Sequence, residues 1–171
     1  MNALTINIRK GYDIPLKGAP TRDVESIGHG EGVAFVPPQT PGLKLRALVR
    51  EGDTVRCGQP IVRDKAREGL MFAAPASGTV RALLLGRRRV LQAVVIAPAA
   101  QDEYESYPRF DASAIRQVSR ERLLEPLLRS GLFACLRRRP FSKVPKPDGR
   151  PRDIFVNAMS TAPFLADIRA G

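Results

Sequence analysis

Short apolar runs separated by glycine and proline dominate the first hundred residues. Between residues 33 and 98 the runs are "VAFVP", "LKLRALV", "QPIV", "LMFAAP", "GTVRALLL" and "VLQAVVIAP". Runs of this length with turn residues between them are typical of short β-strands in a small barrel or sandwich. We therefore predict a β-rich domain over residues 30–100, preceded by a strand-and-turn extension over residues 1–29.

After Pro98 the pattern changes to a polar, acidic connection and then to helical spacing. The stretch "SRERLLEPLLRSG" repeats leucine at helical intervals, which predicts a stripe that faces the core. We expect Ser119 to cap the start of this helix and Gly131 to follow its end. Because Pro126 lacks an amide donor and clashes with the preceding turn, we expect a kink or an early stop there.

The last third of the chain mixes helical, loop and strand patterns. "LFACLRRR" predicts a second short helix, "PFSKVPKPDGRP" a loop and "RDIFVNAM" a further strand. We therefore expect a helical linker segment with a basic loop over residues 101–150, and the truncated start of an α/β domain over residues 151–171. The fold class is α+β.

Two turn motifs narrow the architecture of the β-rich domain. Gly52 and Gly58 permit the positive φ angles that tight strand reversals require. Pro75 and Gly78 make a matching turn in a second half of the domain. Two such halves related by a pseudo-twofold axis resemble the barrel-sandwich hybrid of lipoyl and biotinyl domains, and the resemblance covers residues 43–97.

The tripeptide "DKA" around Lys65 resembles the modified lysine motif of lipoyl carrier domains. In those domains the lysine lies at the tip of the hairpin between the two halves. Here we expect the tip at residues 67–69, with Gly69 as the turn residue. Lys65 is then a solvated hairpin charge that can pair with Glu68, and a carrier module modified on Lys65 is the alternative function.

The chain carries 28 lysines and arginines against 17 acidic residues, a net charge of +11. A surface with this much positive charge is compatible with simple solvation, with an anionic membrane or with an acidic partner subunit. No nucleic-acid-binding motif frames the basic residues, so we expect no nucleic acid partner. One basic cluster is Arg87, Arg88 and Arg89; the second, opposed only by Asp148, is Arg137, Arg138, Arg139, Lys143, Lys146, Arg150 and Arg152.

Few residues are suited to metal binding or catalysis. Cys57 and Cys135 are far apart in sequence and only one histidine is present, so we predict no metal site and two reduced thiols. No nucleophile–base pair, phosphate loop or dinucleotide-binding turn is visible, and we predict no self-contained active site. The N-terminus alternates like a strand rather than a signal peptide, and no apolar run reaches the length of a bilayer.

Several longer segments, in order, carry a more specific resemblance. They are "IRKGYDIPLKGAP", "LVREGDTVRCGQPIVRDK", "FAAPASGTV", "RRVLQAVVI", "LLRSGLFACLRRRPFSKVP" and "PRDIFVNAMSTAPF". Together they resemble the A subunit of the bacterial sodium-translocating NADH:quinone reductases, most specifically in "RPFSKVP" and "IFVNAM". Members of that family are considerably longer, so we expect an N-terminal portion. Ser160 stands where the family usually has an acidic residue.

The resemblance implies a non-catalytic subunit that is peripheral to the bilayer, on the cytoplasmic face of the bacterial inner membrane. Its complex passes electrons from NADH through flavins in other subunits to ubiquinone and exports Na⁺. It further implies integral membrane subunits as partners, ubiquinone as a ligand and no covalently bound cofactor in this chain. We expect the isolated chain to lack NADH dehydrogenase activity.

The stretch "RRRPFSKVPKP" is the most site-like part of the sequence. A quinone needs an apolar or aromatic wall and a polar donor, and Phe141, Ser142 and Lys143 supply these types within one loop. His29 in "GHGEG" is a further candidate contact, because an imidazole titrates near neutral pH. The alternative is a surface loop that packs Phe141 into the core and docks three arginines on partner subunits: Arg137, Arg138 and Arg139.

Overall fold

The computed structural model describes residues 7, 10–11, 16–18, 23, 25, 30–38, 40, 42–67 and 69–157. The predicted N-terminal strand and turn lie mostly outside the described residues, as do His29, Glu68 and Ser160. The chain forms two compact units, one of residues 28–150 and one of residues 1–27 with 151–171. All the helices and strands of the described residues lie in the first unit.

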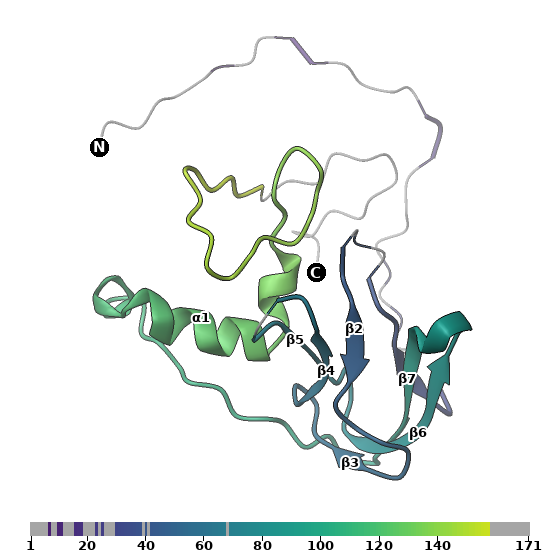
Figure 1. Ribbon diagram of the computed structural model, residues 1–171. Coiled ribbons are helices and arrows are strands. Elements are labelled where there is room, and N and C mark those ends of the chain that lie inside the picture. The colour runs from purple at the N-terminus through teal and green to yellow at the C-terminus, as the bar shows by residue number, and fades with distance from the viewer. Residues whose placement is uncertain are drawn as a thin grey trace. The chain divides into compact units, whose positions relative to one another are not determined.

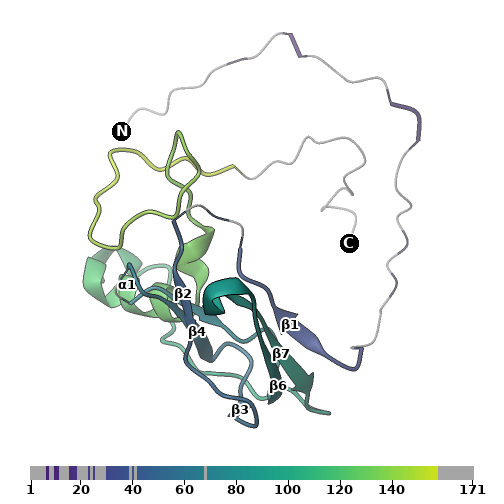
Figure 2. The same cartoon turned by 45° about the vertical axis from the view of Figure 1, so that its right-hand side comes forward.

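Seven short strands of the described chain form two antiparallel sheets. Their order is β1-β7-β6-β3 in the first sheet and β2-β4-β5 in the second, and Figures 1 and 2 show the two sheets from two directions. This arrangement confirms the predicted β-rich barrel-sandwich hybrid. The strands are β1 (Val33–Phe35), β2 (Leu45–Ala47), β3 (Thr54–Val55), β4 (Pro60–Asp64), β5 (Met71–Ala73), β6 (Gly78–Leu85) and β7 (Leu91–Pro98).

A mostly aliphatic core, which also includes Phe72 and Phe133, fills the unit. Strand β6 buries Gly78 and Val80 and exposes the residues between and beyond them, Thr79 and Arg81. Burying one such aliphatic side chain stabilises the fold by about 1.5–3 kcal/mol. The side chains that are almost entirely removed from solvent are Val55, Ile61, Val62, Leu70, Val80, Val94 and Ile96.

Glycines make the turns that the sequence predicts. Gly52 and Gly58 have φ angles of 90° and 87°, and Gly69 between β4 and β5 has φ 78°. Gly78 serves a different purpose, since a Cβ placed on it would lie 2.0 Å from the Ala97 carbonyl oxygen. The start of β6 can therefore pair closely with β7 only because residue 78 has no side chain.

Helix α1 (Arg120–Arg129) begins where the sequence predicts. The Ser119 side chain accepts a hydrogen bond from the Arg122 amide at 3.3 Å, which satisfies one of the free amides of the first turn. Leu124 and Leu128 pack against the core. Gly131 follows the helix with φ 81°, as expected of a residue beyond a helix C-terminus.

Of the two outcomes predicted at Pro126, the early stop is wrong, because α1 continues to Arg129, and the kink stays a prediction. Pro126 is itself buried, and its carbonyl accepts a hydrogen bond from the Ser130 amide at 2.9 Å. Packing of α1 against β5 therefore outweighs the one amide hydrogen bond that the proline removes.

Beyond α1 the predicted short helix is present, and the predicted strand is not. The 3₁₀ helix η3 spans Leu132–Cys135, so the three arginines that follow lie outside it. Two further 3₁₀ turns are η1 (Arg87–Arg89) and η2 (Ile115–Gln117). The strand predicted for "RDIFVNAM" is wrong over residues 152–157. A strand needs a neighbour for its backbone hydrogen bonds, and none of the described strands pairs with this segment.

The connection after β7 is attached to the barrel rather than free. The Cys57 amide donates to the Glu103 carbonyl and the Glu105 amide donates to the Cys57 carbonyl, both at 2.8 Å. The Tyr107 hydroxyl donates to the Gly58 carbonyl at 2.7 Å. These bonds define a strap, residues 101–107, that leads the chain from the barrel toward α1.

Candidate functional site

The basic loop, residues 137–150, follows η3 and has a defined backbone. The Arg138 amide donates to the Lys143 carbonyl at 2.7 Å, and Val144 is buried in the core. From the start of α1, Arg120 Nη2 donates to the carbonyls of Pro147 and Gly149 at 2.8 and 2.9 Å. The loop is therefore anchored in its middle to the core and near its end to α1.

The arginines of the second basic cluster differ in their surroundings. Arg137 Nη1 donates to the carbonyls of Ala134 and Leu136, so its guanidinium caps the end of η3. Arg138 and Arg139 are exposed. Arg152 lies in the other compact unit, where its Nε is 2.6 Å from an Asp153 carboxylate oxygen.

Phe141, Ser142 and Lys143 lie together in the turn of this loop that the Arg138–Lys143 bridge closes. Ser142 has a positive φ of 52°, and Lys143 Nζ lies 5.7 Å from the centre of the Phe141 ring. The expectation that Phe141 packs into the core is wrong, because 73% of it is exposed. One ring face already meets an ammonium group, a favourable cation–π contact. His29 lies outside the described residues, so its predicted contact stays a prediction.

Lys65 lies directly after β4 and is exposed. Its amide donates to the Lys44 carbonyl at 2.8 Å, which ties residue 65 to the segment before β2. Gly69 has the positive φ expected of the turn residue. The lysine is therefore held at the side of the β4–β5 connection, ahead of the turn at Gly69.

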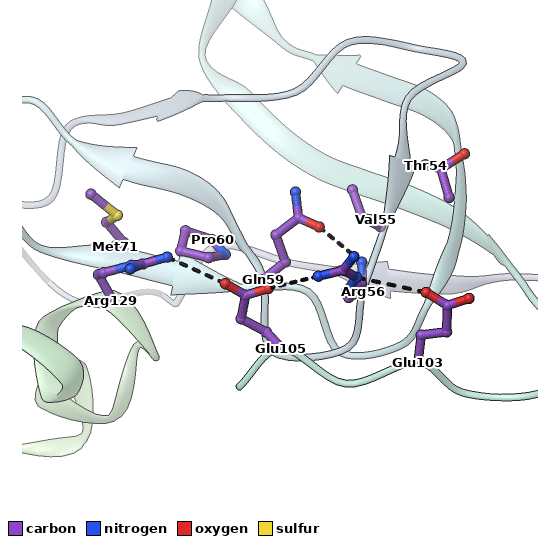
Figure 3. A pocket seen from close by; sticks show the side chains of 9 residues that line it. All are labelled: Thr54, Val55, Arg56, Gln59, Pro60, Met71, Glu103, Glu105 and Arg129. Carbon is purple, nitrogen blue, oxygen red and sulfur yellow. Dashed lines mark hydrogen bonds and ion pairs between the residues drawn. The ribbon is translucent and has the colours of Figure 1, made fainter. Parts of the chain in front are cut away.

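An open groove of about 710 Å³ lies between β3, β5, the strap and α1. Figure 3 shows its charged side chains in a row, with Arg56 between Glu103 and Glu105 and Arg129 reaching Glu105 from α1. The nitrogen–oxygen distances are 3.6, 3.8 and 3.3 Å in that order. Two arginines balance two glutamates, so these side chains do not favour a ligand of either charge.

The sequence does not reveal this row of charges. Arg56 and Glu105 are far apart in the chain, and they meet because the strap pairs with Cys57 in a parallel bridge. The only hint is the acidic composition of "QDEYESY" after the barrel. Beside the row, burial raises the pKa of Tyr107; the Arg129 charge opposes this and the Glu105 charge adds to it.

The cysteines offer little reactive chemistry. Both thiols are free, and the Cys57 Sγ lies 3.6 Å from the Pro75 carbonyl oxygen. Burial, and secondarily the Asp102 charge, raises the pKa of Cys57, which disfavours the nucleophilic thiolate. Among the described residues, no three His, Cys, Asp or Glu side chains gather to hold a metal ion.

No helix in the described part of the chain has the length and apolarity needed to cross a bilayer.

Comparison with known proteins places the two parts of the chain in one family. Residues 6–99 match the NqrA N-terminal barrel-sandwich hybrid domain. Residues 118–170 match the NqrA second alpha/beta domain. The first match ends one residue beyond β7, and the second includes α1 and the basic loop.

Curated relatives share the same assignment. The A subunit of the Na(+)-translocating NADH-quinone reductase from Yersinia pseudotuberculosis serotype O:1b (strain IP 31758) is 43% identical over 162 residues, 95% of this chain and 36% of the relative. The corresponding protein of Actinobacillus succinogenes is 42% identical over the same coverage. The chain thus spans about 36% of the length of these relatives. With both of its parts matched, the chain belongs to the NqrA family, the A subunits of Na⁺-translocating NADH-quinone reductases, and corresponds to the N-terminal portion of such a protein.

Proposed function

We propose that this chain acts as a non-catalytic, peripheral part of a sodium-pumping NADH:ubiquinone oxidoreductase at the cytoplasmic face of the bacterial inner membrane. The observation that carries the proposal is the 43% identity over 162 residues to the A subunit of such an enzyme. In this role the other subunits, integral membrane subunits among them, hold the flavins, react with NADH and export Na⁺. The chain itself contributes a barrel that positions surfaces for assembly.

The chemistry of the described residues supports a role in assembly rather than in electron transfer. The charged groove is internally neutralised by its ion pairs, and the partly buried thiol of Cys57 has a raised pKa. Neither offers a group poised to exchange electrons or protons with a substrate near neutral pH. NADH oxidation by the purified chain without added flavin would contradict the non-catalytic role.

The basic loop is the surface that we assign to contacts with the other subunits. Exposed like charges repel one another in the free chain, and an acidic partner relieves that repulsion. The structure identifies Arg138 and Arg139 as the pair to test, because Arg137 is bonded to backbone carbonyls and its loss would disturb η3.

The test is co-purification of the full-length subunit with the membrane subunits over a series of salt concentrations. Arg138→Ser with Arg139→Ser should weaken association, most at low salt, because surface charges are screened beyond a Debye length of about 8 Å at physiological salt. The matched control is Arg109→Ser with Arg116→Ser, which removes the same charge from two exposed side chains outside the loop. Equal association of both variants would show that the basic loop is only a solvated surface.

Ubiquinone contact at Phe141, Ser142 and Lys143 is a second part of the proposal. The support is their shared position on one turn, with an exposed aromatic ring beside an ammonium donor. Phe141→Ala should reduce labelling by a photoreactive ubiquinone in the assembled enzyme, whereas Phe155→Ala, a change at another exposed phenylalanine, should not. Unchanged labelling at residues 141–143 in the Phe141→Ala variant would contradict this contact.

The alternative is a lipoyl- or biotin-type carrier modified on Lys65. Its support is the barrel-sandwich hybrid fold and the exposure of Lys65. Its weakness is that Lys65 lies directly after β4, with its amide bonded to Lys44. Intact mass of the protein purified from its native host separates the two functions. If the mass of a lipoate or biotin is present in the unmodified sequence and absent in Lys65→Arg, the carrier function is supported and the assembly role proposed above is contradicted.

A further inference from the structure

The end of the β6–β7 hairpin combines exposed aliphatic and basic side chains. Leu84, Leu85 and Val90 are 49%, 47% and 62% exposed. The three arginines of η1 lie between them in the chain and are exposed. In Figure 1 this end lies on the far side of the barrel from α1, well away from the basic loop. The hairpin end is therefore a second, separate basic surface.

The backbone of the hairpin end is closed by its own hydrogen bonds. The Gly86 amide donates to the Val90 carbonyl at 2.8 Å, and the Arg89 amide donates to the Gly86 carbonyl at 3.1 Å. None of the three arginines forms an ion pair or a side-chain hydrogen bond with any described residue. Their guanidinium groups are thus available to an external partner.

Two of these arginines occupy a backbone conformation that arginine disfavours. Arg88 and Arg89 have φ angles of 55° and 57°, in the left-handed region that glycine or asparagine adopts at lower cost. Local stability therefore does not explain arginine at either position. Strain of this kind is retained where the side chain is needed.

Charge and composition point to one kind of partner. No aspartate or glutamate occurs in residues 69–101, and the carboxylate bonded to the hairpin is Glu51, which accepts from the Leu83 amide at 2.9 Å. Strands β6 and β7 contain no aromatic residue. Aromatic side chains stack on nucleic-acid bases and anchor many protein interfaces. Their absence from these two strands therefore argues against a nucleic acid and against a protein as the partner. Aliphatic side chains beside arginines suit a layer of lipid headgroups over acyl chains.

We propose that the β6–β7 hairpin end binds the surface of an anionic phospholipid bilayer. Arg87, Arg88 and Arg89 contact lipid phosphates, and the neighbouring aliphatic side chains enter the boundary between headgroups and acyl chains. The proposal rests on the hairpin itself and not on the role in the reductase complex, because it is tested with this chain and lipid alone.

The experiment measures partitioning of the chain onto vesicles of phosphatidylcholine with and without phosphatidylglycerol. The decisive variant is Arg88→Gly with Arg89→Gly, since glycine fits the left-handed backbone and should leave the melting temperature unchanged or higher. Each surface arginine contributes about a fivefold gain in partitioning at low salt. The variant should therefore bind anionic vesicles about 25-fold more weakly, and the charge-matched control Arg109→Ser with Arg116→Ser much less so.

A second variant tests the aliphatic part of the contact. This variant combines Leu84→Thr, Leu85→Thr and Val90→Thr, and threonine still favours strands. It should remove the vesicle binding that persists when salt screens the arginines. Equal binding by the glycine variant and its control would overturn the proposal, as would equal binding of the unmodified chain to both kinds of vesicle. Binding to single-stranded RNA is measured with the same proteins. If the unmodified chain binds RNA and the glycine variant loses that binding but still binds vesicles, the membrane proposal is overturned in favour of a nucleic-acid surface.

Discussion

The Arg67 guanidinium lies 2.6 Å from the Asp64 carboxylate, and the Asp64 side chain is completely buried. The other Asp64 oxygen accepts from the amides of Lys44 and Ala66 at 3.0 and 3.1 Å. Arg67 also donates to the Gly42 carbonyl at 3.0 Å. One carboxylate thus joins the β4–β5 connection to the segment before β2.

Removing that carboxylate should destabilise the barrel strongly. Asp64→Ala leaves a mostly buried guanidinium without its counter-charge and two amides without an acceptor, which should lower the free energy of unfolding by about 3–5 kcal/mol. Urea denaturation measures the loss. Glu125→Ala is the control, because it removes one partner of an exposed ion pair in α1 and should change stability by less than about 0.5 kcal/mol. Similar effects of the two changes would contradict the importance of the buried pair.

Gly78→Ala should also destabilise the fold. The added Cβ would lie 2.0 Å from the Ala97 carbonyl oxygen, and the φ of 147° disfavours a side chain. Strain and overpacking together should cost about 2–5 kcal/mol, seen as a lower melting temperature. Gly30→Ala is the matched change, since nothing lies within 4 Å of its added Cβ. A melting temperature equal to that of Gly30→Ala would show that β6 and β7 can separate at no cost.

Cys57 should react more slowly with iodoacetamide than Cys135 does. Burial, and secondarily the Asp102 charge, raises the pKa of Cys57, so less thiolate is present at neutral pH. Cys135 is exposed. Mass spectrometry of the two alkylated peptides over a pH series measures both rates. The Cys57 rate should still rise above about pH 8.5, where an ordinary thiol is half ionised; equal rates throughout would contradict the raised pKa.

The same shift has a consequence for stability. Because the folded-state pKa of Cys57 is raised, deprotonation favours the unfolded chain. The contribution of this thiol to stability is complete below the unfolded pKa, about 8.5, and is lost as the pH rises through the folded pKa. A Cys57→Ser variant should therefore lose less stability than the unmodified protein between neutral and alkaline pH.

Tyr107→Phe tests the attachment of the strap. The change removes the hydrogen bond from the Tyr107 hydroxyl to the Gly58 carbonyl, 2.7 Å long, and should lower the free energy of unfolding by about 0.5–1.5 kcal/mol. Tyr104→Phe is the control, because Tyr104 is 69% exposed. Spectrophotometric titration supplies a second measurement, since burial raises the pKa of Tyr107. If all the tyrosines ionise at the pH of an exposed tyrosine, the partly buried environment of Tyr107 is contradicted.

Local features of the fold follow from the sequence because each depends on residues that are close in the chain. The helix cap at Ser119 and the turns at Gly52 and Gly58 are of this kind, and all three are confirmed. The stop at Pro126 is wrong because a tertiary contact, the packing of α1 on β5, offsets a local penalty. Periodicity alone does not report such contacts.

The candidate site also has local features that the sequence predicts and tertiary features that it does not. The sequence identifies the turn of Phe141, Ser142 and Lys143, which are neighbours in the chain. It does not predict that Phe141 is exposed, because an aromatic residue between prolines is equally compatible with burial. The groove joins Arg56, Glu105 and Arg129, and that meeting requires the parallel bridge between Cys57 and Tyr104.

The strap and the basic loop together limit how far this chain can be shortened without exposing its core. The match to the barrel family ends at residue 99, yet the hydrogen bonds at Cys57 and Gly58 are completed by residues 103, 105 and 107. Cutting the chain at residue 99 would leave those backbone groups to water and uncover core side chains beneath η3 and the basic loop. Hydrogen exchange should therefore show barrel and helix opening together, as one cooperative unit. Gene fusions that transplant this barrel need to carry the chain through residue 150 to preserve it.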